Sequence, residues 1–178
     1  MSKAVLAGVL LAGCVTGSAA MAANVEVEAP IHQFYDASAR GDATAQAAAF
    51  LPSVTIMDSV PPHSIWQGNG AFAAWSADAT AWEKGAKAAG LSDPKLALGD
   101  VINEVVTGDN AYVVADTTYA FRQNGVAMRA VARSTFSLSK TANGWKIAGF
   151  SWAWPPCRRE IGTRPPMTVR PACPRRSD

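Results

Sequence analysis

The stretch "GWKIAGFSWAWPPC", residues 144–157, decides how the last strand of this chain can bury its side chains. Its large side chains stand first at odd positions and then at even positions: Trp145 and Ile147, followed by Phe150, Trp152 and Trp154. Because successive side chains of a strand point to opposite faces, a regular strand would place these two groups on opposite faces. One extra residue in the strand would bring all of them to one face.

We therefore predict a β-bulge or sharp bend near Ala148-Gly149, where the glycine suits a bulge well. The later aromatic residues, Phe150, Trp152 and Trp154, would then form a pocket wall. A strand without a bulge is the alternative, and it would place them on the outer face of the sheet as a dimer interface. Two prolines follow at once and end the strand, because proline cannot donate to the ladder.

Three long segments with the strand period of two precede this strand. They are "KLALGDVINEVVTGD" (95–109), "NAYVVADTTYAFRQNG" (110–125) and "VAMRAVARSTFSLSKTANG" (126–144). Turn signals stand at Gly108-Asp109-Asn110, Asn124-Gly125 and Asn143-Gly144, and Asn-Gly pairs favour two-residue hairpin turns. The sequence therefore predicts an antiparallel meander.

Helical spacing dominates the first half of the chain. Two sets of residues recur at intervals of three and four: Ile31, Phe34, Tyr35 and Ser38 in the first, and Phe72, Trp75, Ala79, Trp82 and Ala86 in the second. A Gly41-Asp42 break follows the first set, and Asp42 suits the N-cap of a second, alanine-rich helix. Between the two sets, "SVTIMDSVPPHSIWQG" (53–68) predicts a bent hairpin, because its two prolines interrupt the pairing.

This order of elements predicts an α+β domain at residues 24–154, in which about three helices pack on one face of a curved antiparallel sheet. Four stretches, moreover, resemble the SnoaL-like (polyketide cyclase-like) branch of the nuclear transport factor 2-like, cystatin-like superfamily. They are "FYDASARGDATA" (34–45), "DSVPPHSIWQGNGAFAAW" (58–75), "VTGDNAYVVADTTYAF" (106–121) and "TANGWKIAGFSWAW" (141–154). The resemblance implies a cone-shaped sheet whose concave face and helices enclose a pocket.

The resemblance says less about activity. The superfamily includes isomerases, cyclases, dehydratases, epoxide hydrolases and binding modules, so the fold does not fix the function. It does imply a homodimer packed through the outer face of the sheet, an arrangement common in the family.

The first 23 residues have the pattern of an export signal. Lys3 precedes an apolar run that is too short to span a bilayer, and small residues lead to an Ala-Met-Ala site before Ala23. "LAGC", residues 11–14, also looks like a lipobox, in which Cys14 would carry a lipid that tethers the protein to a membrane. We expect a periplasmic or secreted domain under either interpretation.

The tail, residues 155–178, has a different composition. It holds six of the 11 prolines and six arginines, so we expect it to be disordered. Without the tail and the signal peptide, residues 24–154 carry 9 basic and 12 acidic groups, a net charge of −3, whereas the whole chain carries +2. We expect no nucleic-acid partner. Cys157 and Cys173 could form a disulfide in an oxidising compartment or stay unpaired.

Candidate ligand-binding residues are the large aromatic side chains that the fold would gather around the pocket: Trp66, Trp75, Trp82, Phe150, Trp152 and Trp154. A hydrophobic core alone would also explain such a cluster. As a pocket wall, it would suit a small apolar or aromatic molecule.

Three residues are candidates for acid–base chemistry. Asp58 ends an apolar run, where burial would raise its pKa toward that of a general base, although it could equally cap the turn. His63 could exchange a proton with Asp58 or be a solvated turn residue. Tyr35 could donate to an oxyanion, as a tyrosine does in the isomerases of this family.

The sequence gives less support to other candidate catalytic groups. Asp116 and Arg133 lie on neighbouring strands and are more simply explained by an ion pair on the outer face. We expect no cofactor and no metal site. The sequence favours a pocket that binds a small molecule, with a cofactor-free acid–base enzyme or a protein-interaction module as the alternatives.

Overall fold

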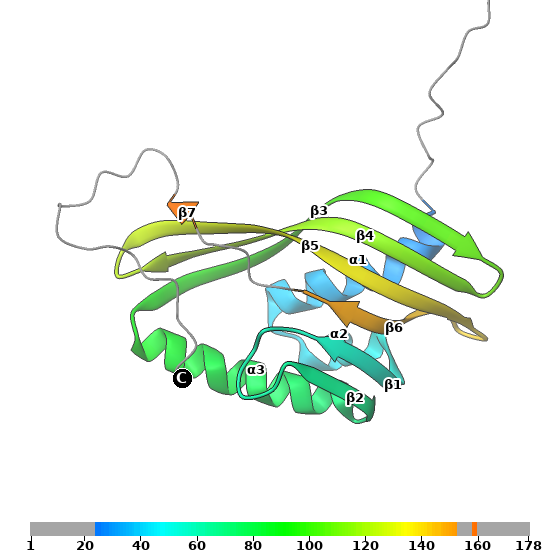
Figure 1. Ribbon diagram of the computed structural model, residues 1–178, viewed down its shortest axis with the longest axis horizontal. Helices are drawn as coiled ribbons and strands as arrows, with labels where there is room; N and C mark the ends of the chain where they lie inside the picture. The colour runs from blue at the N-terminus through cyan, green and yellow to red at the C-terminus, as the bar shows by residue number, and fades with distance from the viewer. Residues whose placement is uncertain (1–23, 153–157, 160–178) are drawn as a thin grey trace, which may run out of the picture.

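The computed structural model describes residues 24–152 and 158–159. Figure 1 shows three helices on one side of a long, twisted sheet. The helices are α1 (Val25–Arg40), α2 (Ala43–Ala48) and α3 (Ala71–Ala88). The strands are β1 (Phe50–Met57), β2 (Ile65–Asn69), β3 (Leu91–Thr107), β4 (Asn110–Gln123), β5 (Val126–Thr141), β6 (Gly144–Ser151) and β7 (Arg158–Arg159).

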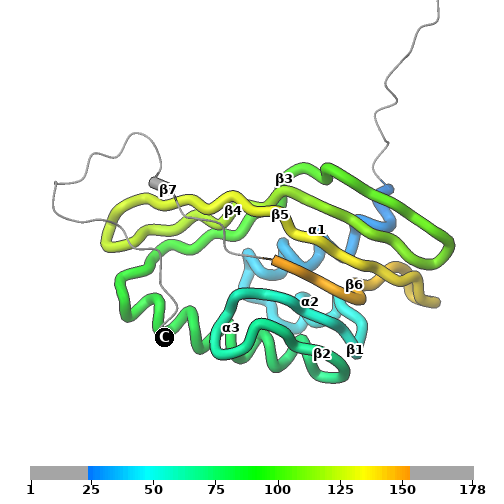
Figure 2. The backbone as a smooth tube through the Cα atoms, in the orientation of Figure 1, coloured from blue at the N-terminus to red at the C-terminus, as the bar shows by residue number. Residues whose placement is uncertain are grey.

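The strands form one sheet in the order β2-β1-β6-β5-β4-β3, with β7 also paired to β5. Strands β3 to β6 form the predicted meander, and the chain trace in Figure 2 brings β1 beside β6. The predicted α+β class, with three helices against a curved sheet, is confirmed. One detail differs from the prediction, because β1 and β6 pair in parallel. No hairpin joins these two strands, so no turn in the sequence sets their relative direction.

The ends of the first two helices follow from single residues. Gly41 adopts a left-handed conformation with φ of 68° and ends α1, as glycine commonly does. Asp42 then caps α2, since its Oδ1 accepts a hydrogen bond of 2.9 Å from the backbone N–H of Ala45. Both features confirm the predicted break and cap.

The predicted bulge in the last strand is confirmed. Ile147 pairs with Leu138 of β5, and Gly149 pairs with the adjacent Ser137, so Ala148 is the extra residue. The large side chains on both sides of the bulge are consequently buried: Trp145, Ile147, Phe150 and Trp152. Trp154 lies outside the described residues.

Phe150 then belongs to the hydrophobic core. Its ring stacks on that of Phe136 with centroids 5.3 Å apart and meets the ring of Phe34 edge-on at 5.6 Å. Phe34 belongs to α1 and Phe136 to β5, so these contacts join the first helix to the sheet. Aromatic pairs of this kind add about 0.5–1.5 kcal/mol each beyond their buried area.

Several predictions concern residues outside the described part of the chain. The signal peptide at residues 1–23, with Cys14, is one of them, and the state of Cys157 and Cys173, paired or unpaired, is another. Within the predicted tail, Arg158 and Arg159 pair with β5 as strand β7, an element that the prediction of a disordered tail did not include. Among the described residues, no helix is long and apolar enough to cross a membrane.

The bulge can be tested by deleting Ala148. Without the extra residue, Phe150 and Trp152 would turn to the opposite face, and removing one such aromatic side chain from a core costs about 3–5 kcal/mol. We expect the deletion to lower the free energy of unfolding by at least about 3 kcal/mol in chemical denaturation. Ala148→Ser, which keeps the residue count, should change it by about 1 kcal/mol or less. A deletion variant as stable as the natural chain would contradict this account.

Candidate functional site

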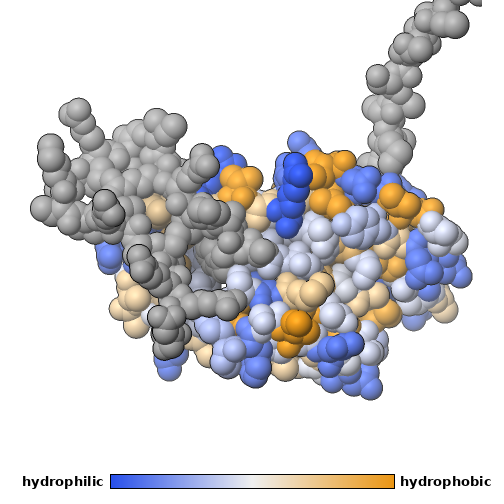
Figure 3. Space-filling view, in the orientation of Figure 1, coloured by the Kyte–Doolittle hydropathy of each residue, from blue (hydrophilic) through white to orange (hydrophobic). Residues whose placement is uncertain are grey.

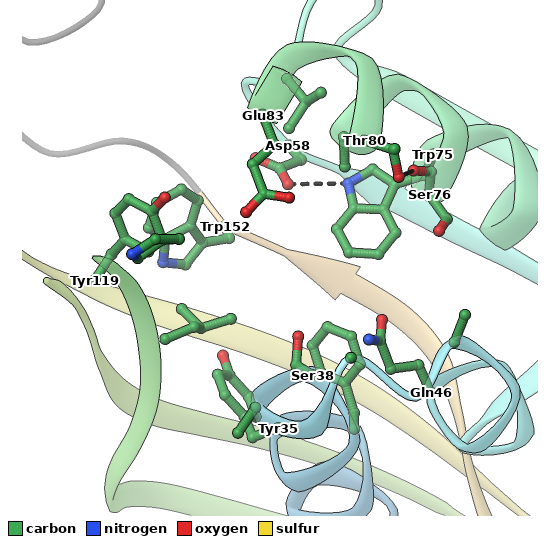
Figure 4. Close-up of a pocket in the computed structure, with 18 of the residues that line it drawn as sticks. Tyr35, Ser38, Gln46, Asp58, Trp75, Ser76, Thr80, Glu83, Tyr119 and Trp152 are labelled. Carbon is green, nitrogen blue, oxygen red and sulfur yellow. Dashed lines mark hydrogen bonds between the residues drawn. The ribbon is translucent and has the colours of Figure 1, made fainter. Parts of the chain in front are cut away.

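A cavity of about 830 Å³ lies between the helices and the sheet. Figure 4 shows its polar side chains, which come from α1, α2, the segment after β1, α3, β4 and the residue that follows β6. Much of the wall is apolar or aromatic: Phe34, Val60, Trp75, Ala79, Trp82, Leu96, Phe150 and Trp152. The volume falls in the range of about 300–1,000 Å³ that is typical of small-molecule sites.

Asp58 follows β1 directly, and its side chain lies in the cavity wall with 8% of the residue exposed. Its Oδ2 accepts a hydrogen bond of 3.0 Å from the indole Nε1 of Trp75, drawn as a dashed line in Figure 4. Its Oδ1 accepts one of 2.6 Å from the backbone N–H of Ser59. Asp58 therefore both caps its turn and faces the cavity, so the two interpretations of this residue are compatible.

Burial raises the pKa of the Asp58 carboxyl above its ordinary value of 3.8, and the hydrogen bonds from Trp75 and Ser59 oppose the rise. A carboxyl with a raised pKa favours folding while it is protonated. This contribution to stability is fully present below pH 3.8 and is lost as the pH rises through the raised value. A carboxyl in this position exchanges its proton closer to neutral pH than a solvated aspartate does.

Tyr35, on α1, lines the same cavity, and only 4% of it is exposed. In Figure 4 its hydroxyl points from α1 into the cavity. The hydroxyl lies 3.0 Å from Oγ of Ser134, a fully buried residue of β5. Burial raises the pKa of Tyr35 to about 12, Ser134 and Thr117 act against the rise, and the charge of Asp58 adds to it. Tyr35 is thus a neutral hydroxyl at physiological pH, able to donate.

His63 lies elsewhere. Its side chain is 62% exposed, and its Nδ1 lies 2.8 Å from Oδ2 of Asp78 on α3. The same Asp78 oxygen accepts a 2.9 Å hydrogen bond from Trp66 Nε1. These two hydrogen bonds join the β1–β2 hairpin to α3, and they lower the pKa of Asp78. The structure does not bring His63 to Asp58.

The predicted aromatic residues divide into two groups. Trp75, Trp82, Phe150 and Trp152 line the cavity. Trp66 is buried in the core and is not among the lining residues. Trp154 lies outside the described residues.

Sequence reasoning missed four residues that the site uses. Thr117 and Ser134 are buried behind Tyr35, and Tyr119 and Glu83 line the cavity. Burial raises the pKa of Tyr119 to about 12, and the nearby charge of Glu83 adds to this effect. The strand period could have identified two of them. Thr117 and Tyr119 lie at alternate positions before the buried Phe121, so their side chains point to the same face of the strand.

Two remaining expectations concern charged groups. Arg133 and Asp116 are cross-strand partners, with Nε and Oδ1 3.5 Å apart and with 70% and 45% of their side chains exposed, so the predicted surface ion pair is confirmed. Such pairs contribute about 0.2–1 kcal/mol. Within residues 24–152, histidine, cysteine and acidic side chains form no group of three able to hold a metal ion.

The fold and the cavity together define the class of protein, an α+β cone of the nuclear transport factor 2-like type. The sequence itself matches the SnoaL-like domain over residues 27–151, and the chain belongs to this family. No curated protein matches it.

Solved structures agree on the fold. An NTF2-like protein with a cystatin-like fold from Novosphingobium aromaticivorans has a TM-score of 0.58 at 19% identity, covering 72% of this chain and 79% of that one. A ketosteroid isomerase-like protein from Erwinia carotovora atroseptica has a TM-score of 0.53 at 21% identity, covering 73% and 94%. A CaMKII hub from S. rosetta has a TM-score of 0.58 at 22% identity, covering 73% and 95%.

The hydrogen bond between Trp75 and Asp58 can be tested through the pKa of Asp58. The indole donates to the ionised carboxylate, so Trp75→Phe should raise this pKa by about 0.5–1. A titration of the side-chain carboxyl carbon by NMR would measure the change. Trp66→Phe is the matched control, because its indole donates to Asp78 instead and its loss should leave the pKa of Asp58 unchanged. An equal response to both substitutions would argue against a specific role for Trp75.

Proposed function

We propose that the cavity binds a small, largely apolar or aromatic molecule that carries an oxygen atom. The supporting observation is the combination of an aromatic wall with two inward-facing polar groups, the Asp58 carboxyl and the Tyr35 hydroxyl. Apolar walls supply affinity through burial, and a few placed polar groups fix the orientation of the ligand.

A second candidate function is proton transfer on the same molecule, without a cofactor. Asp58 would act as the acid or base, and Tyr35 would donate to the oxygen on which charge develops. The raised pKa of Asp58 favours this candidate, because an effective general base titrates near the working pH. The similarity to a ketosteroid isomerase-like protein is compatible with it. His63 has no part in this proposal, because its partner is Asp78.

Binding of a ligand in the aromatic cavity can be tested with 9-fluorenone, a flat aromatic ketone. We expect Ser38→Trp, which places an indole in the lining, to weaken fluorenone binding at least tenfold by taking up part of the cavity. Asp36→Trp introduces the same side chain on an exposed part of the same helix and should leave binding unchanged. Equilibrium dialysis measures both, and native mass spectrometry of the purified protein would identify any molecule that it retains.

The outcomes are separable. Equal binding by the natural chain and Ser38→Trp would place fluorenone outside the cavity. Failure of the natural chain to bind fluorenone up to its solubility would count against aromatic ketones as ligands.

We also propose a homodimer that packs through the outer face of the sheet. Large apolar side chains stay exposed there on adjacent strands, among them Met57 beside Ile65 and Tyr112 beside Val105. Figure 3 shows apolar residues interspersed with polar ones on one side of the molecule. The similarity to a CaMKII hub is compatible with assembly through this fold.

The dimer can be tested by placing charge on this face. The double substitution of Val105→Glu and Tyr112→Glu should convert the protein to a monomer in sedimentation velocity, because it would bury like charges at the interface. Lys84→Glu changes an exposed residue on α3 and should leave the dimer intact. A natural chain that sediments as a monomer would rule the proposal out.

Export by residues 1–23 and a tether through Cys14 stay predictions from the sequence.

A further inference from the structure

A continuous series of hydrogen-bonding groups runs behind Tyr35, from α1 across two strands to the end of β6. The Tyr35 hydroxyl lies 3.0 Å from Oγ of Ser134, which lies 3.3 Å from Oγ1 of Thr117. Trp152 Nε1 donates to this Thr117 oxygen at 3.1 Å. Thr117 Oγ1 also lies 3.4 Å from the carbonyl oxygen of Ala132, to which it can donate. Ser134 and Thr117 are almost completely buried.

Trp152 fixes one end of the series, because an indole N–H donates and never accepts. The four groups carry one donor hydrogen each, and the three contacts that link them use three of these hydrogens. One hydrogen is therefore in excess. The excess hydrogen can be that of Thr117, which then points to the Ala132 carbonyl over a long 3.4 Å. It can instead be that of Tyr35, which points into the cavity when Thr117 donates to Ser134 and Ser134 donates to Tyr35.

We propose that Trp152, Thr117 and Ser134 form a relay that directs the Tyr35 hydroxyl hydrogen into the cavity, so that the site selects a ligand with an acceptor oxygen, such as a ketone or an enolate. An acceptor at Tyr35 gives the excess hydrogen a short contact to the ligand, while the contacts within the series, including the 3.3 Å one between Thr117 and Ser134, are kept. A donor group at the same place leaves the excess hydrogen on the long contact to Ala132. The three residues act on the ligand through Tyr35 and are positioning residues.

This inference rests on the proposed function, because it needs a ligand in the cavity, and it specifies the chemistry of one end of that ligand. Aligned hydroxyls polarise one another, so the relay should also make Tyr35 a stronger donor than an isolated tyrosine. Ser134 and Thr117 act to lower the pKa of Tyr35 against the effect of burial.

The first test of the relay needs no ligand. The chain has only three tyrosines, so 3-fluorotyrosine labelling gives three fluorine NMR signals, and Tyr35→Phe assigns one of them. We expect Ser134→Ala and Thr117→Val, which remove a hydroxyl with little change in shape, to raise the pKa of residue 35 by about 0.5–1. Thr117→Ser keeps the hydroxyl and should restore the natural value. Ser137→Ala, on the exposed side of β5, is the matched control.

The second test compares 9-fluorenone with fluorene, which has the same rings and a CH₂ group in place of the carbonyl. We expect the natural chain to bind fluorenone about five- to tenfold more tightly than fluorene. The carbonyl stretch of bound fluorenone should move to lower frequency in the infrared spectrum. Both effects should be lost in Tyr35→Phe and reduced in Ser134→Ala, whereas a merely structural role would leave the carbonyl frequency unchanged.

The two tests separate this inference from the proposed function. An unchanged pKa of residue 35 in Ser134→Ala and Thr117→Val overturns the relay, whatever binds. Equal affinity for fluorenone and fluorene, or an unshifted carbonyl band, overturns the selection of an acceptor oxygen while leaving an apolar binding site in place. Absence of binding by both compounds counts against the proposed function, and the fluorine titration still decides the relay.

Discussion

One extra residue in β6 determines which side chains reach the interior of this protein. With Ala148 in the bulge, the aromatic residues on both sides of it face the helices. Phe150 then packs against α1 and β5, and Trp152 reaches Thr117. A regular strand would turn both side chains to the outer face and remove part of the cavity wall together with the donor at the end of the relay. The core and the candidate site therefore depend on the same local irregularity.

The cavity combines apolar surface with buried polar groups, which are costly unless they are hydrogen-bonded. Two tryptophans supply both apolar surface and hydrogen-bond donors. Trp75 contributes its ring to the wall and its N–H to the Asp58 carboxyl, and Trp152 contributes its ring and an N–H that leads through Thr117 toward Tyr35. Asp58 thus has direct support from an aromatic residue of the wall, and Tyr35 has support from another through Thr117 and Ser134. Replacing either indole with a purely apolar ring would keep much of the wall and change the chemistry.

Much of the fold could be predicted from the sequence, because its signals are local. Gly41-Asp42, the Asn-Gly turns and the change of parity at Ala148-Gly149 each act within a few residues of themselves. The parallel pairing of β1 with β6 could not be predicted in this way, since it joins segments that no turn connects. This pairing is set by the packing of the whole domain.

The site was less predictable, because its residues meet only in three dimensions. Asp58 and Tyr35 were chosen for their chemistry and do line one cavity, but Asp78 on α3 holds His63 outside it. Ser134 and Thr117 are small polar residues within strands. The strand period places Thr117 on the buried face, but no local pattern shows what either residue contacts. Only the tertiary structure shows that they lie behind Tyr35.

Binding and proton transfer place related demands on this cavity. The burial that makes it suitable for an apolar molecule is also the main cause of the raised pKa of Asp58. An apolar ligand that displaces water from the carboxyl adds to this desolvation and favours the protonated form further. By reciprocity, protonation of Asp58 then favours the ligand. The hydrogen bonds from Trp75 and Ser59 act in the opposite direction, and the balance between burial and these two donors decides whether Asp58 meets its ligand as an acid or as a base.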